Sequence, residues 1–282
     1  MKINGGTLFQ LFKYTVYVLL TINVYLFFVQ EYAAAQLQFL DGIVAGQLIE
    51  AYAATIDTFA WVILLLMFEL ETYVLDDRHF TRSVTWSLHG LRALCYAFII
   101  YAFYGYIQNL IFMYGATPLP DVSKLCTLVT EQWSYATALD EYVQITAENC
   151  SILSNMDAFH RFAGMAAVVD IGGLTDIRYL AWVDVINAAV WLLVVLVLEA
   201  DVQLQERNRF EGLVLKLSNA AKVVLYSVLL LAAIYWGVKG DFVDFWDAFL
   251  WLIAFVLIEL NVFEWHQESL EQAAAHEATE TS

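Results

Sequence analysis

Six apolar runs alternate with polar stretches along this chain, and the alternation predicts its fold. A hydrocarbon core of about 30 Å is crossed by roughly 20 helical residues, and each run is of that order. Backbone amides cannot stay unpaired in lipid, so each run is expected to be an α-helix. We therefore predict an all-α integral membrane protein with six transmembrane helices. The runs cover residues 14–29, 54–74, 88–113, 179–202, 223–238 and 242–263.

The composition agrees with this prediction. Of 282 residues, 61% are hydrophobic and only 15% are charged, whereas a soluble domain keeps about a quarter of its residues charged. The formal net charge of −17 argues against nucleic acid as a partner, because binding it requires a basic surface. The acidic residues lie mostly in loops and tails, where they either concentrate cations or simply solvate exposed segments.

The basic residues predict the topology. With the N-terminus in the cytoplasm, nine basic residues fall on the inner side and four on the outer side, so both termini are expected inside. The first apolar run is too long for a signal peptide and lacks a small-residue cleavage site, so we expect it to be retained. The expected location is a bacterial or archaeal plasma membrane. The expected partners are the lipid bilayer and either further copies of this chain or other membrane subunits.

The predicted spans and topology divide the chain into four parts. Helices 1–3 occupy residues 1–115, an external segment residues 116–177, and helices 4–6 residues 178–266, and residues 267–282 form a disordered acidic tail. In the external segment, apolar residues at helical spacing predict an amphipathic helix that lies on the bundle or on the headgroups. These residues are Leu125, Leu128, Val129, Trp133 and Ala136.

Three cysteines occur in the chain. Cys126 and Cys150 both fall in the external segment, where a disulfide would close a loop of about 24 residues and contribute about 3 kcal/mol in the chain-entropy model. The alternative is two free thiols. Cys95 falls within the third apolar run and is expected to be a small buried residue.

Two patterns recur three times along the chain. In the even-numbered runs an acid or amide precedes Trp by four residues, Glu follows eight residues later, and a further acid or amide follows two beyond. In the odd-numbered runs a cation precedes Tyr by four residues. Together they predict three sequential hairpins, arranged about a pseudo-threefold axis unless the repetition is coincidental. The first pattern is Asp57, Trp61, Glu69, Glu71, then Asn187, Trp191, Glu199, Asp201, then Asp247, Trp251, Glu259, Asn261; the second is Lys13 and Tyr17, Arg92 and Tyr96, Lys222 and Tyr226.

These charges are expected to pair. A charged group inside the hydrocarbon costs roughly 2.5–3.5 kcal/mol on insertion scales, so each cation should meet an acid. Pairing within a hairpin and pairing between adjacent hairpins serve equally well. Glu69 and Glu71 differ by about 200° around a helix axis, so they cannot both face the bundle interior. The pairs within hairpins would be Lys13 with Glu69, Arg92 with Glu199, and Lys222 with Glu259.

Two polar layers follow from this arrangement. The three glutamates and three cations would form one layer, and Asp57, Asn187 and Asp247 a second layer about 18 Å away, from twelve residues at 1.5 Å each. Such layers suit a channel-like protein or a secondary transporter for a cation or small polar solute. The acids and amide of both layers would bind or gate the solute, with the three cations as countercharges: Glu69, Glu199, Glu259, Asp57, Asn187 and Asp247. A closed bundle with polar residues at both interfaces has the same pattern. The alternative function is therefore a non-catalytic scaffold subunit of a larger membrane complex.

Other chemistry has little support. No phosphate-binding glycine loop occurs, and nothing places a nucleophile beside a base, so an integral membrane enzyme with an inner-face metal is only the third hypothesis, after transport and the scaffold role. Mitochondrial-type carriers share a three-hairpin plan, but their proline-containing signature is absent, so membership is not inferred. No cofactor is predicted. The weak candidates for an inner-face metal have suitable ligand types but no recognisable spacing, and the alternative is that they are solvated interfacial residues. They are His79, His89, His266 and Glu71.

Overall fold

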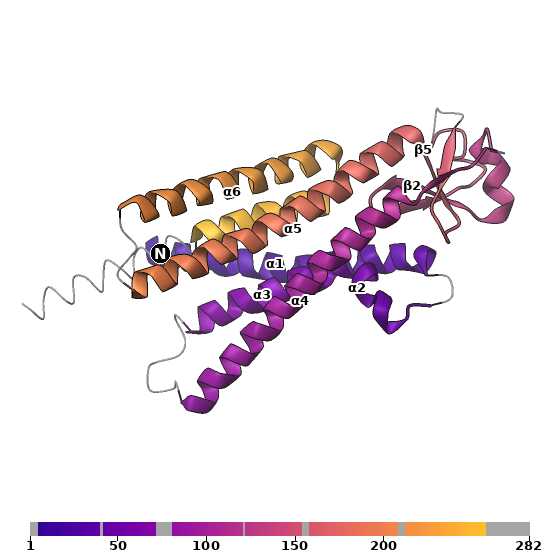
Figure 1. Ribbon diagram of the computed structural model, residues 1–282. Coiled ribbons are helices and arrows are strands. Elements are labelled where there is room, and N and C mark those ends of the chain that lie inside the picture. Colours follow the sequence, from indigo (N-terminus) through magenta and orange to yellow (C-terminus); the bar gives the residue numbers. More distant parts are fainter. Residues whose placement is uncertain are drawn as a thin grey trace, which may run out of the picture.

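The structure is a computed structural model, and it describes residues 5–39, 42–71, 81–120, 122–153, 158–207 and 212–257. Long helices form a bundle, and a small β-domain lies at one end of it, joined to the ends of α4 and α5 (Figure 1). This end is called the sheet end. The opposite end, where Lys13 of α1 pairs with Glu69 of α3, is called the ion-pair end.

The length and composition of the helices support a helical membrane protein. Among the described residues, four helices contain segments long and apolar enough to cross a membrane, and a bent fifth brings the number to five. The last helix is described over residues 242–257, so the six-helix arrangement is not established by the described part of the chain. The long helices are α1 (Gly5–Gln38), α3 (Ala53–Glu69), α4 (Arg82–Tyr114), α5 (Ile171–Glu206) and α6 (Gly212–Lys239).

The second apolar run enters the bundle through a broken helix. The 3-10 helix η1 (Ala45–Gln47) and α2 (Leu48–Ala51) meet α3 at an angle of 80°. The buried carboxylate of Glu31, on α1, accepts hydrogen bonds from the backbone amides of Ala54 at 2.7 Å and Thr55 at 3.0 Å. These amides are in the first turn of α3 and lack a helical partner, so Glu31 stabilises the start of α3 from a neighbouring helix.

The segment that was predicted to be external forms a β-domain, which corrects the all-α prediction. Its five-stranded sheet has the order β1-β4-β5-β2-β3, in which β2 and β5 are parallel and the other pairs are antiparallel. The elements are β1 (Thr117–Pro118), the 3-10 helix η4 (Leu125–Glu131), β2 (Ser134–Ala138), β3 (Glu141–Gln144), β4 (Phe159–Arg161) and β5 (Ala167–Asp170).

The predicted amphipathic helix in this segment is wrong. The 3-10 helix η4 ends at Glu131, because Gln132 has a φ of 56° and leaves the helical conformation, and the chain then continues through Trp133 into strand β2, which contains Ala136. Leu125 and Leu128 are buried in a core of the β-domain rather than against headgroups. The disulfide prediction is confirmed: Cys126 and Cys150 are bonded, with their Cα atoms 4.9 Å apart, and Cys95 is free and buried.

The β-domain is packed firmly on the bundle. One continuous apolar core joins Ala136, Phe162 and Val169 of the β-domain to Met113 of α4 and Trp236 of α6. A separate core fills the middle of the bundle around three buried tryptophans. The sheet end of the bundle is therefore a single packed unit, in which a residue of the β-domain can contribute to a site between the helices.

Candidate functional site

Three tryptophans that occupy equivalent positions of the repeated pattern meet in the centre of the bundle. The ring centroids of Trp61, Trp191 and Trp251 lie 5.9, 6.2 and 6.5 Å from one another, and all three side chains are buried. They come from α3, α5 and the helix of residues 242–257. The residues four positions earlier lie one helical turn nearer the sheet end, on the same faces of these helices.

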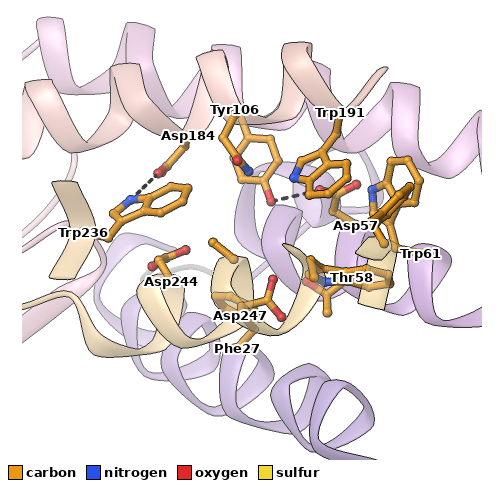
Figure 2. A pocket seen from close by; sticks show the side chains of 14 residues that line it. Phe27, Asp57, Thr58, Trp61, Tyr106, Asp184, Trp191, Trp236, Asp244 and Asp247 are labelled. Atoms are coloured by element: carbon orange, nitrogen blue, oxygen red, sulfur yellow. Dashed lines mark hydrogen bonds between the residues drawn. The ribbon is translucent and has the colours of Figure 1, made fainter. Parts of the chain in front are cut away.

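Those earlier residues line one cavity of about 40 Å³. Asp57, Asn187 and Asp247 all contribute to its wall, so the layer predicted from the sequence is brought together. Two further acids, Asp184 and Asp244, line the same cavity. Figure 2 shows these carboxylates around a common space beside the tryptophans. Each new acid precedes a predicted residue by three positions, and this spacing on one helix face is the signal that could have identified it.

Neutral donors hold the carboxylates in place. The Asn23 amide donates to Asp247 at 2.9 Å, Tyr106 donates to Asp57 at 3.4 Å, and the Trp236 indole donates to Asp184 at 3.3 Å (Figure 2 shows the last two). Nothing in the sequence patterns pointed to these three donors. No Lys, Arg or His is among the described residues that line the cavity, so its negative charge is not balanced by a basic side chain in its wall.

A second cavity of about 40 Å³ continues toward the sheet end. It shares four wall residues with the first, among them Tyr106, Asp184 and Asp244. Asp241 lines the second cavity and Trp251 the inner end of the first. The stretch from one to the other rises about 15 Å along the last helix, and this rise is the depth of the acidic region. The acids that only the second cavity contains are Glu31, Glu50, Asp140 and Asp241.

Asp140 brings the β-domain into this acidic region. It lies in the turn between β2 and β3, with a φ of 59°, and lines the second cavity beside Asn109 of α4. Burial, together with the negative charge of Asp241, raises the pKa of the Asp140 carboxyl to about 6, against the opposing effect of a hydrogen bond with Asn109. Burial also raises the pKa of Asp241. The outer part of the region therefore retains protons at a pH at which an exposed aspartate is ionised.

The ion-pair end is organised differently from the cavities. Lys13 pairs with Glu69 at 2.6 Å, as predicted, and Tyr17 donates to the same carboxylate at 3.3 Å. Arg92 does not pair with Glu199 as predicted within a hairpin, and the predicted partner of Lys222, Glu259, is not among the described residues. Arg92 pairs with Glu71 at 2.6 Å, and Lys222 pairs with Asp201 at 3.0 Å.

Both of these pairs join adjacent hairpins, which is the alternative that the sequence left open. The geometric reason is that residues two positions apart on a helix point about 200° apart around its axis. Only one of Glu199 and Asp201 can therefore face Lys222. Glu199 is exposed and accepts a hydrogen bond from Tyr96 at 3.3 Å. Glu259 and Asn261 lie outside the described residues.

The candidate metal ligands do not form a centre in the described part of the chain. No three His, Cys, Asp or Glu side chains of the described residues lie close enough to hold a metal ion. His89 is exposed, with its Nδ1 2.7 Å from the Thr85 carbonyl oxygen, and Glu71 accepts from Arg92 instead. His79 and His266 lie outside the described residues.

An apolar layer separates the cavities from the ion pairs. Leu20, Leu65, Val194 and Ala254 are buried on the helix turns between the tryptophans and the ion-pair end. The structure therefore shows a polar region that reaches inward from the sheet end and stops at the tryptophans.

Comparison of the chain with known protein families, with curated proteins and with solved structures gave no match.

Proposed function

We propose that this chain is a multi-pass membrane protein that passes a cation or small polar solute, as a channel-like protein or a secondary transporter. The observation that carries the proposal is the convergence of Asp57, Asp184, Asp244 and Asp247 on one small cavity whose described wall contains no basic residue. Buried carboxylates without counter-charges need protons or cations to neutralise them. Acids inside membrane helices typically mark ion or proton pathways.

In this proposal three hairpins surround the pathway, with the sheet end outside the cell and the ion-pair end in the cytoplasm. The meeting of Trp61, Trp191 and Trp251 supports a pseudo-threefold arrangement, because equivalent positions of the repeat lie around one point. A disulfide-bonded domain at the sheet end supports the assignment of that end to an oxidising exterior. The excess of basic residues near the other end supports a cytoplasmic assignment.

The tryptophans are the proposed gate. A cation that enters from the sheet end meets the carboxylates first and then an apolar constriction, which blocks permeation because it cannot hold the ion's water. Passage requires the helices that carry the rings to separate. The pairs Arg92–Glu71 and Lys222–Asp201 link adjacent hairpins at the far end, so their rupture would allow the hairpins to move apart. In this scheme Glu69, Glu199 and Glu259 contribute to a second gate at the cytoplasmic end, formed by the charged layer.

Flux through proteoliposomes tests the proposal. Asp57→Asn and Asp247→Asn should lower cation flux, because each removes a carboxylate from the cavity wall. Trp191→Ala should raise the leak, because it removes one ring of the constriction. Asp176→Asn is the matched control, since Asp176 is an exposed aspartate paired with Lys239 and lines neither cavity. Wild-type flux in both cavity variants, with the proteins shown to be folded, would overturn the proposal.

A scaffold role remains the second candidate, and the apolar centre of the bundle favours it. At the ion-pair end Glu69, Glu71 and Asp201 are each neutralised by a separate cation, and buried apolar side chains fill the space between that end and the cavities. A scaffold subunit should be purified in gentle detergent together with stoichiometric partner chains and should show no flux in any variant. A monodisperse protein that conducts cations would exclude this role.

A further inference from the structure

We infer that the cavity beside the tryptophans takes a monovalent inorganic cation, an alkali ion or hydronium, held between Asp57 and Asp247. The inference rests on the proposed function in so far as it names the ion for that site. It is carried by the unpaired oxygens near the cavity, by the type of donor in the wall, and by the size of the space.

Two amide oxygens next to the carboxylates have no hydrogen-bond donor. Asn23 has no exposed surface, and its Nδ2 is committed to Asp247 at 2.9 Å, yet its Oδ1 is buried without a partner. Asn23 lies one helical turn from Phe27, which lines the cavity. The Oδ1 of Asn187, in the cavity wall, is also buried without a partner. Leaving a buried acceptor unsatisfied is unfavourable, and a cation bound in the cavity would satisfy the Asn187 oxygen that lines it.

The donors in the wall are hard oxygen ligands. The carboxylates of Asp57, Asp184, Asp244 and Asp247, the Asn187 amide and the Thr58 hydroxyl line the cavity, and no His, Cys or Met does so among the described residues. Oxygen donors suit alkali and alkaline-earth ions, whereas zinc and copper sites use nitrogen or sulfur.

The arrangement of the acids favours a single positive charge. Ca²⁺ takes about 6–8 oxygen ligands and Mg²⁺ requires near-octahedral geometry, so both are held by several carboxylates close together or by retained water. No three acidic, His or Cys side chains of the described residues lie close enough to share one metal ion. Asp57 and Asp247 instead each have one oxygen occupied by a neutral donor. A weakly held monovalent ion fits this wall better than a divalent one.

The size of the space excludes organic cations. The cavity volume of about 40 Å³ accommodates a few water molecules, at about 10–15 Å³ each on the same measure. An ammonium group that carries several carbon atoms does not fit. The tryptophan rings also pack against one another in tilted and edge-on arrangements, so they do not present the open faces that cage a quaternary ammonium.

Intrinsic tryptophan fluorescence tests the inference directly, because Trp61, Trp191 and Trp251 border the cavity. The purified full chain in detergent is titrated with NaCl, KCl or CaCl₂ against choline chloride at constant ionic strength, and separately with acid. A saturable change with Na⁺, K⁺ or protons, and none with choline, is expected. Asp247→Asn should weaken that response by roughly tenfold or more, as for a lost charge-assisted contact, and Asp176→Asn should leave it unchanged.

A saturable response to Ca²⁺ or choline alone, or no response to any cation, would overturn the inference. Asn187→Ala provides a second variant if Asp247→Asn does not fold, and it should weaken the same response. The thermal midpoint of the wild-type chain should also rise with the bound ion, because a ligand that binds only the folded state stabilises it. Saturable binding of Na⁺, K⁺ or protons without any flux in proteoliposomes would leave this inference intact and overturn the proposed transport function.

Discussion

Lys13 and Glu69 form an ion pair that is almost completely buried. Their side chains are 3% and 8% exposed, and Lys13 Nζ lies 2.6 Å from Glu69 Oε1. Tyr14 and Tyr17 donate to the same carboxylate at 3.0 and 3.3 Å. Three donors therefore satisfy one buried acid, and the pair links the start of α1 to the end of α3.

Removing only the cation of this pair should destabilise the protein strongly. Lys13→Met leaves the Glu69 carboxylate buried and without its counter-charge, which typically costs about 3–5 kcal/mol. The double variant Lys13→Met/Glu69→Gln should recover much of that loss because no buried charge remains. Thermal unfolding in detergent measures both effects. Lys239→Met is the control and should change the midpoint little, since its pair with Asp176 is exposed. Equal effects of Lys13→Met and Lys239→Met would contradict the burial argument.

Two glycines of α4 should respond in opposite directions to alanine. A Cβ at Gly105 would approach the Ile49 carbonyl oxygen to 2.7 Å, where α2 crosses α4, so Gly105→Ala must displace backbone. We expect a loss of about 1–3 kcal/mol, as for overpacking. A Cβ at Gly90 meets nothing within 4 Å, so Gly90→Ala should gain about 0.5–1 kcal/mol from helix propensity. Chemical denaturation measures the free energy of unfolding of both variants. A Gly105→Ala protein that is more stable than the wild type would contradict close packing where α2 crosses α4.

Loss of the disulfide should loosen the β-domain. The bond between Cys126 and Cys150 spans 24 residues, and Cys126→Ser/Cys150→Ser should lower stability by about 3 kcal/mol in the chain-entropy model. Limited proteolysis should then cut the chain between α4 and α5 first. Cys95→Ala leaves the bond intact and should not expose this segment. A thiol assay under denaturing conditions gives an independent check: one reactive thiol is expected before reduction and three after it.

Stability should fall as the pH rises through the range in which Asp140 titrates. Its folded-state pKa is about 6 because of burial and the charge of Asp241, whereas an unfolded aspartate has a pKa of about 3.9. The folded chain holds a proton that the unfolded chain releases, so the penalty grows between about pH 4 and pH 6 and is complete above that. It amounts to at most about 2–3 kcal/mol, lowered by partial exposure.

Asp140→Asn tests this dependence because it removes the titrating group and keeps the shape. The variant should be more stable than the wild type at neutral pH and should lose the fall in thermal midpoint between about pH 4 and pH 6. Thr137→Ala, an exposed change on the same hairpin, should retain the wild-type pH profile. An Asp140→Asn protein with the wild-type profile would mean that another group, such as Asp241, causes it.

The helical bundle was predictable because lipid forces its backbone to pair locally, and apolar runs report that requirement residue by residue. The disulfide was predictable for a similar reason, since both cysteines fell in one polar segment. The convergence of Asp57, Asn187 and Asp247 was implied by a repeat whose members share helix faces. In each case the decisive information is local or periodic.

The sheet, the broken entry to α3 and the choice of ion-pair partners were decided by tertiary structure. Strands of two to five residues in the external segment carry little periodicity, and parallel pairing of β2 with β5 depends on contacts distant along the chain. Glu31 stabilises the start of α3 from another helix, which no local pattern reveals. Likewise, sequence spacing placed Arg92 and Glu199 at the same depth along the bundle. The orientation of neighbouring helices nevertheless brings Glu71, and not Glu199, into contact with Arg92. Periodicity determines which side of a helix a residue occupies, and only packing determines what that side meets.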